Sequence, residues 1–182
     1  IKEGLIWVGS DDGLLHLTRN GGKTWENITP ENLPEWLMIN SIEPSAFDPA
    51  VCYIAGSLYK TGDFKPYLYK TEDYGKTWRL ITSGIKAEHF TRVLRADPKR
   101  KGLLYAGTET GIYISFDDGL SWSSFQLNLP IVPITDMTIK DNSLIVATQG
   151  RSLWVLDDLG LLHQINKNTL NEGMTLFEPK QS

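Results

Sequence analysis

The side chains of this sequence that are most regularly spaced and able to do chemistry are carboxylates and amides within a repeated box. The box consists of a hydroxyl residue, any residue, Asp or Asn, any residue, Gly, any residue, a hydroxyl residue and Trp, and it occurs at 18–25, 71–78 and 115–122. Such a carboxylate could act as a general acid or base or as a calcium ligand. The repetition favours a structural use, because a fold needs the same chemistry in every repeat and a catalytic site needs it once.

Each position of the box suits the tight turn of a β-hairpin. The third residue can accept hydrogen bonds from backbone N–H groups, the Gly can take a positive φ, and the flanking hydroxyl groups can close the same set of bonds. The Trp then begins the next strand and covers the turn. A fainter fourth copy at 156–163 has lost both hydroxyls and the Trp. The predicted structural residues are Thr18, Asn20, Gly22, Trp25, Thr71, Asp73, Gly75, Trp78, Ser115, Asp117, Gly119, Trp122, Asp158 and Gly160.

The spacing of the boxes predicts the architecture. Successive Trp residues are 53 and 44 residues apart, and His163, in the Trp position of the fourth copy, follows 41 residues later. Repeats of about 40–50 residues that each contain several strands are typical of propeller blades. The sequence therefore predicts an all-β fold, a β-propeller fragment of about three and a half to four four-stranded antiparallel blades.

The predicted blades divide the chain unevenly. A partial blade at 1–29, lacking its innermost strand, is followed by blades at 38–83, 91–127 and 134–166, the last of which ends with an expected strand at 162–165. The segment 56–66 is expected to be a long loop, and 167–182 a linker or a tail that covers an edge. The missing inner strand indicates a piece of a larger ring, whose remaining blades would be its partners.

Composition excludes several classes of function. The net charge is −4 with both signs interspersed, which does not suggest a nucleic-acid footprint. No apolar run is long enough to span a membrane. Cys52 is the single cysteine and is expected to be inert, no His or Cys cluster has metal spacing, and no phosphate-binding loop opens a helix. We therefore expect no metal and no cofactor.

The boxes resemble the Asp-box, or BNR, repeat of sialidases, xyloglucanase-type glycosidases and sortilin-like proteins. Residues 64–71, 97–108 and 150–158 are similar, more narrowly, to the large bacterial sortilin-like BNR proteins that are often labelled glycosyl hydrolases. The resemblance covers nearly the whole chain, as the C-terminal half of the propeller. An extracellular or periplasmic location is expected. In that group the position of Gln149 is usually His, so this chain departs from the pattern there.

Candidate ligand contacts lie on the rim opposite the boxes, where the loops between second and third strands meet the connectors between blades. Loops at such a rim can vary without disturbing the blades. Possible binding residues there are Asp12, Trp36, His89, Arg92, Gln149 and Arg151. Possible catalytic carboxylates are Asp63, Glu88 and Glu109, with Asp11 and Asp12 also available. A glycosidase requires two such groups roughly 5–5.5 Å apart for retention or 6.5–9.5 Å for inversion.

Two functions remain open at this point. The chain could be a carbohydrate- or protein-binding scaffold without chemistry, or half of a glycoside hydrolase. Sequence spacing singles out no acid/base pair, and a sialidase would need three convergent arginines where only Arg92 and Arg151 are well placed. Some of these residues also have a purely structural interpretation. Asp11-Asp12-Gly13 is typical of a hairpin turn, and His89 could be a packing residue. The sequence favours binding.

Overall fold

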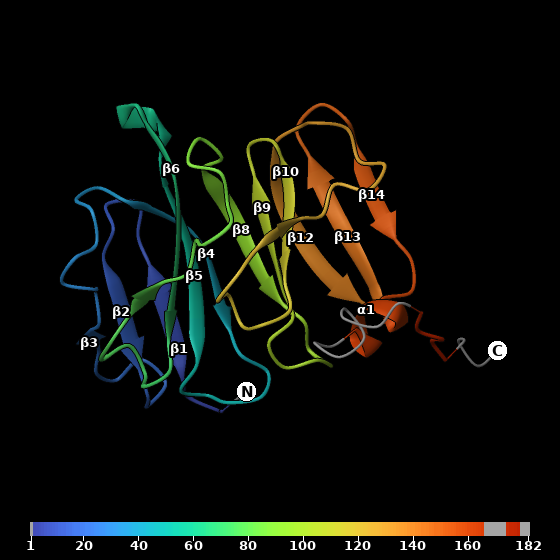
Figure 1. Ribbon diagram of the computed structural model, residues 1–182. Helices are drawn as coiled ribbons and strands as arrows, with labels where there is room; N and C mark the ends of the chain where they lie inside the picture. Colours follow the sequence, from blue (N-terminus) through green and yellow to red (C-terminus); the bar gives the residue numbers. More distant parts are fainter. Residues whose placement is uncertain (1, 166–173, 179–182) are drawn as a thin grey trace.

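The computed structural model of the chain describes residues 2–165 and 174–178. Four antiparallel sheets follow one another along these residues and stand side by side (Figure 1), each with its strands in sequence order. The chain is therefore a β-propeller fragment of consecutive antiparallel blades, which confirms the predicted fold class.

Two sheets have three strands and two have four. The first contains β1 (Ile6–Gly9), β2 (Leu15–Thr18) and β3 (Glu26–Asn27). The second contains β4 (Met38–Pro44), β5 (Cys52–Leu58), β6 (Asp63–Thr71) and β7 (Arg79–Leu80). The third contains β8 (Thr91–Ala96), β9 (Leu104–Thr108), β10 (Gly111–Ser115) and β11 (Ser123–Ser124). The fourth contains β12 (Ile134–Lys140), β13 (Ser143–Thr148) and β14 (Leu153–Leu156).

The apolar core is divided into three clusters, one between each pair of neighbouring sheets. Representative buried pairs are Leu17 with Tyr69, Leu68 with Leu94, and Tyr105 with Met137. Strands that carry apolar side chains on both faces, such as β5 and β10, are buried throughout because a sheet covers each face. Each blade is thus stabilised mainly by its neighbours.

The second box shows how the repeated turn is built. Asp73 Oδ1 accepts hydrogen bonds from Thr71 Oγ1 and from the Thr77 backbone N–H, both at 2.9 Å, and its Oδ2 accepts from Thr77 Oγ1 at 2.6 Å. The Gly75 N–H donates to Thr71 Oγ1 at 2.9 Å, and Gly75 has a φ of +83°. Tyr74, at the fourth position, also has a positive φ (+63°), which the sequence pattern did not reveal.

The other boxes repeat these bonds. Asp117 accepts from the Ser115 hydroxyl and from the Ser121 hydroxyl and N–H at 2.6–2.9 Å. Asn20 Oδ1 accepts from the Thr18 hydroxyl and the Thr24 N–H at 2.9 and 3.0 Å, while its amide donates to the Thr24 hydroxyl. Asp158 in the faint copy accepts from the Gly160 N–H at 3.0 Å.

The boxes also hold neighbouring blades together. Trp78 Nε1 donates to the Ile28 carbonyl at 2.8 Å, and Trp122 Nε1 donates to the Ile81 carbonyl at 2.6 Å, so each indole reaches the end of the previous sheet. A Cβ atom at Gly75 would lie 2.7 Å from the Ile28 side chain. The box Gly is therefore required by close packing between blades as well as by its φ.

Two local predictions were wrong. Most of the strand expected at 162–165 is instead part of a short helix, α1 (Gly160–Gln164), which contains His163, the residue in the place of the box Trp. Leu159 and Leu162 are buried three residues apart, so one face of this turn packs into the core.

The long loop expected at 56–66 is mostly paired strand. Leu58 pairs with Asp63, and the 3₁₀ turn η1 (Tyr59–Thr61) followed by Gly62 (φ +87°) closes the hairpin. The predicted tail at 167–182 lies partly outside the described residues. Of its described part, Glu178 exchanges two hydrogen bonds (2.8 and 3.1 Å) with the side chain of Gln164 in α1. Within the described residues, no helix is long and apolar enough to cross a membrane.

Candidate functional site

The connector from the first blade to the second presents an exposed aromatic side chain in an unusual conformation. Trp36 is 69% exposed and has a φ of +62°, where bulky side chains are rare. Its neighbour Leu37 is fully buried, and the Leu37 N–H donates to the Pro34 carbonyl at 3.2 Å. The turn that buries Leu37 therefore directs Trp36 into solvent. Strained backbone of this kind concentrates at functional positions.

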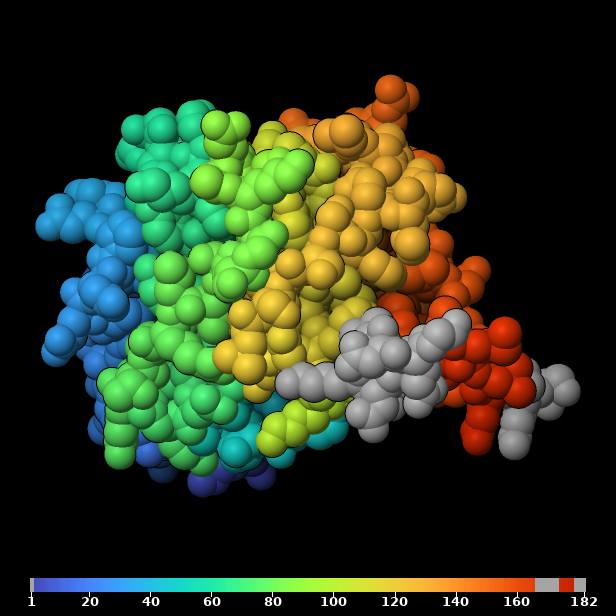
Figure 2. All heavy atoms as spheres, viewed as in Figure 1, coloured from blue at the N-terminus to red at the C-terminus, as the bar shows by residue number. Residues whose placement is uncertain are grey.

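Trp36 borders an open pocket of about 290 Å³. The pocket lies between this connector and the hairpin that joins β1 to β2, and its lining is Asp12, Gly13, Leu14, Thr29, Leu33, Pro34, Glu35 and Trp36. The connector is the light-blue segment at the left edge of Figures 1 and 2. The structure therefore brings together two predicted binding residues, Asp12 and Trp36.

The hairpin fixes the carboxylate of this pocket. Ser10 Oγ donates to Asp12 Oδ1 and accepts from the Leu14 N–H at 3.0 Å. The hydrogen bond from Ser10 lowers the pKa of Asp12, so this carboxylate is an acceptor at neutral pH. An aromatic face beside a fixed acceptor can stack on the apolar face of a sugar ring and bind its hydroxyl groups.

A second group of predicted residues lies between the second and third blades. Arg92 donates to Glu109 Oε2 from Nε at 2.8 Å and from Nη2 at 2.7 Å, and its guanidinium lies 5.3 Å from the Tyr59 ring and 5.1 Å from the Phe90 ring. The Tyr59 and Phe90 rings are stacked with centroids 5.0 Å apart. This arrangement pairs Arg92 with Glu109.

His89 is directed inward rather than toward this aromatic group. Its Nδ1 lies 2.6 Å from Thr110 Oγ1 and 2.9 Å from Tyr113 Oη. Burial lowers the pKa of His89, so the ring is neutral at pH 7. Glu88, beside it in sequence, is exposed.

The other predicted residues lie on two hairpins, Asp63 on the one between β5 and β6 and the remaining two on the one between β13 and β14. Asp63 accepts from the Lys65 N–H at 2.9 Å and from the Tyr67 hydroxyl at 2.8 Å, and the first of these bonds lowers its pKa. Gln149 and Arg151 are exposed on the hairpin between β13 and β14, where the Arg151 carbonyl accepts from Trp154 Nε1 at 2.9 Å.

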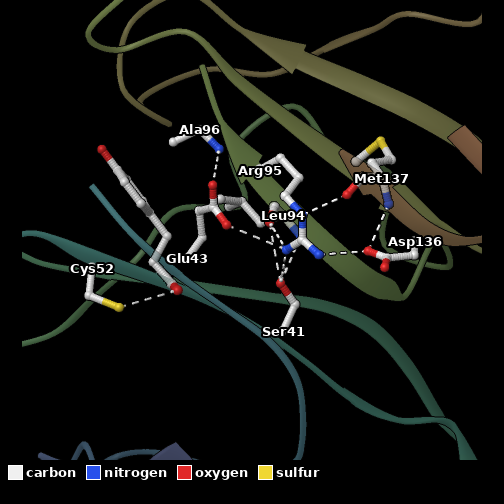
Figure 3. A network of polar contacts seen from close by, with 9 residues as sticks. Ser41, Glu43, Cys52, Leu94, Arg95, Ala96, Asp136 and Met137 are labelled. Atoms are coloured by element: carbon white, nitrogen blue, oxygen red, sulfur yellow. Dashed lines mark hydrogen bonds and ion pairs between the residues drawn. The ribbon is translucent and has the colours of Figure 1, made fainter. Parts of the chain in front are cut away.

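Sequence reasoning missed a charged cluster on the first strands of three blades. Arg95 on β8 bonds Asp136 on β12 through Nη2 at 2.6 Å and lies 3.5 Å from Glu43 on β4 through Nη1 (Figure 3). Its Nε donates to the Met137 carbonyl at 2.7 Å, and Nη1 also donates to Ser41 Oγ at 3.1 Å. Burial raises the pKa of Glu43. The sequence carries no clear signal for this cluster, because each of these strands also contains other polar or charged residues.

A further missed cluster joins the second blade to the third. The Lys70 ammonium group is buried and lies 2.6 Å from both Asp118 Oδ2 and Glu72 Oε1, while the Tyr53 hydroxyl donates to Asp118 Oδ1 at 2.5 Å. Asp118 is the variable fourth residue of its box, so the repeat pattern could not identify it. Among the described residues, no group of three or more His, Cys, Asp or Glu side chains could hold a metal ion.

The chain is similar to short stretches of two curated proteins. No family model matches the chain. It is 29% identical over 113 residues to the oligoxyloglucan-reducing end-specific xyloglucanase of Emericella nidulans, covering 59% of this chain and 13% of that protein. A probable xyloglucanase of the same specificity from Neosartorya fischeri is 24% identical over 108 residues, with the same coverage. The chain thus spans about an eighth of the length of these curated relatives.

Solved structures support the fold at lower identity. The GH74 enzyme of Niastella koreensis has a TM-score of 0.65 at 16% identity, over 86% of this chain and 27% of that one. YCF48 bound to D1 peptide has a TM-score of 0.63 at 22% identity, over 84% of this chain and 48% of that one. Similarity at this level shows the propeller fold alone.

Proposed function

We propose that this chain is a carbohydrate-binding segment of a β-propeller, with the Trp36 pocket as its contact site. The observation that carries the proposal is a Trp that is 69% exposed, held in a rare backbone conformation, at the edge of a pocket that also contains a fixed carboxylate. The lining of the pocket is rigid, because buried Leu37 anchors the connector and Ser10 anchors Asp12. The sequence relationship to xyloglucanases supports a β-glucan-type oligosaccharide as the ligand.

The test is calorimetric titration of the chain with xyloglucan and cellulose oligosaccharides. Trp36→Ala should weaken binding by about 2 kcal/mol, or about thirtyfold, as expected for an aromatic residue at the centre of an interface. Asp12→Asn should reduce affinity less, because the amide keeps one acceptor oxygen. Trp25→Ala is the matched control, since Trp25 is also exposed (45%) but belongs to a box on the opposite rim.

If Trp36→Ala and Trp25→Ala lost affinity equally, or if no oligosaccharide bound the parent chain, the proposal would be wrong. If the chain bound a peptide and none of the oligosaccharides, the protein-binding alternative would be supported instead.

Hydrolysis is the second candidate, favoured by the names of the matched relatives. Of the predicted carboxylates, Asp63 has a lowered pKa and is therefore not prepared to donate a proton, and Glu109 forms an ion pair with Arg92. Among the described residues, Glu43 is the carboxyl group whose pKa is raised, which is the property that a general acid needs. Reducing-sugar release that Glu43→Gln or Asp63→Asn abolishes, with the fold intact, would establish the enzymatic alternative.

A further inference from the structure

Three of the four sheets end in a short outer strand, and within the described residues the fourth sheet has none. β3 pairs with β2, β7 with β6 and β11 with β10, in each case antiparallel and over two residues. In the fourth sheet β14 pairs with β13, and among the described residues no strand pairs with its other edge. Here α1 (Gly160–Gln164) covers the second half of the fourth box and ends at the position where an outer strand begins in the other blades.

The register of the other blades identifies the backbone groups on this open edge. The residue that follows each outer strand donates its N–H to a carbonyl three residues before the box: Ile28 to Leu15 at 2.9 Å, Ile81 to Leu68 at 2.8 Å, and Phe125 to Ile112 at 2.8 Å. Counting back from the fourth box, the equivalent carbonyl belongs to Leu153. Because N–H and C=O groups of alternate residues point to the same side, Leu153 and Val155 both direct theirs to the open edge.

The sequence of β14 does nothing to protect this edge. Natural proteins blunt exposed edges with charged residues, Pro or bulges, whereas β14 reads Leu-Trp-Val-Leu and pairs with β13 without a bulge. Leu153 is 67% exposed and Val155 is 55% exposed. These side chains project from the face of the sheet, so the strand-accepting feature of β14 is its unpaired backbone, in a strand of high β-propensity.

We propose that β14 binds an extended segment of a partner polypeptide, which adds antiparallel as the fourth strand of this sheet. The outer strands of the other three sheets, β3, β7 and β11, indicate which sequence the partner segment should have. Their sequences are Trp-Glu-Asn-Ile, Trp-Arg-Leu-Ile and Trp-Ser-Ser-Phe. The two central residues are exposed in each case, so they can be of any polarity, whereas the fourth residue is always apolar. The partner segment is therefore an aromatic residue, two unrestricted residues and an apolar residue, in extended conformation.

The inference does not depend on carbohydrate binding, and it is tested with the chain itself. The probe is a fluorescein-labelled peptide copying residues 119–127, which contains the outer strand of the third blade. Fluorescence anisotropy should show saturable binding to the parent chain. Val155→Pro removes one N–H from the open edge without removing a bond to β13, and it should weaken binding about fivefold to tenfold, the value of one hydrogen bond.

Two controls keep the result decisive. Val155→Thr retains the N–H and should bind the peptide as the parent chain does. If Val155→Pro fails to fold, as judged by circular dichroism, the same test is made from the other side with a peptide carrying Ser123→Pro, which should lose affinity for the unaltered chain. Absence of peptide binding, equal binding by the proline forms, or protection of β14 by dimerisation of the chain would overturn the proposal.

Discussion

Trp122→Phe tests whether the repeated boxes hold neighbouring blades together. Trp122 is 4% exposed, and its indole N–H donates to the Ile81 carbonyl of the preceding blade at 2.6 Å. Phenylalanine keeps an aromatic ring in the same place but has no donor. Ile81 is itself buried (3% exposed), so water cannot easily replace the lost hydrogen bond.

The expected cost follows from these contacts. Leaving a buried carbonyl without its donor costs about 1–2 kcal/mol. The smaller ring forfeits about 1 kcal/mol of apolar burial. Trp122→Phe should therefore lower the free energy of unfolding by about 2–3 kcal/mol, which for a chain of this size lowers the melting temperature by about 2–4 °C for each kcal/mol. Urea titration followed by fluorescence and by circular dichroism measures the change.

The chain contains its own control at the same position of the repeat. Trp25 ends the first box but is 45% exposed, and its indole meets no preceding blade in the part of the chain that the structure describes. Trp25→Phe should change stability by less than about 0.5 kcal/mol, as surface substitutions usually do. Equal losses in the two variants would show that the Trp stabilises its own turn and that the contact between blades contributes nothing.

Three further changes probe the turn and the charged cluster. Asp73→Ala should cost about 1–3 kcal/mol through lost turn hydrogen bonds and leave oligosaccharide affinity unchanged, whereas Asp73→Asn should cost less because Asn20 makes the same bonds. Burial tends to raise the pKa of Asp73, but hydrogen bonds from Thr77 outweigh it and the pKa is lowered. The contribution of Asp73 to stability is therefore present above the ordinary pKa of 3.8 and is lost as the pH falls through the pKa of the folded state. Acid titration of Asp73→Asn should show a smaller loss of stability than that of the parent chain. Burial raises the pKa of Glu43, so this group favours folding below its ordinary pKa of 4.5, and the contribution is lost as the pH rises through the pKa of the folded state. Glu43→Gln should remove this pH dependence from the free energy of unfolding. Arg95→Met leaves Glu43 without its cation and should destabilise the chain by about 3 kcal/mol in urea titration, a loss that Glu43→Gln in the same chain should partly restore.

The fold could be predicted because its chemistry is repeated. One box that occurs three times predicts the period, the turn and the strand that follows, and the structure confirms the fold class that this period predicted. The fourth blade shows the limit of this reasoning. There the pattern was extended to a strand at 162–165, although the hydroxyls and the Trp were absent, and the residues formed a helix that buries Leu159 and Leu162.

The candidate site was only partly predictable for a different reason. Asp12 and Trp36 could be assigned to one rim from topology, and the structure places both at one pocket. Arg95 could not be assigned, because its partners lie 52 and 41 residues away on other blades and nothing local in the sequence connects them. Contacts of this kind depend on how inner strands meet, which is set by packing between sheets rather than by any motif.

Departures from the repeat are therefore the best guide to what this propeller does. A residue type that recurs in every blade is explained by the blade, as Asp73 and Asp117 are by their turns. A residue that breaks the pattern has no such explanation, and two departures stand out. One is the connector that exposes Trp36, and the other is the fourth box, after which no outer strand pairs with β14 in the part of the chain that the structure describes. One offers an aromatic surface and the other a strand edge, on opposite sides of the same rigid frame. The side chains that these departures expose, Trp36, Leu153 and Val155, lie outside the buried core, so binding can be altered there by mutation without unfolding the chain.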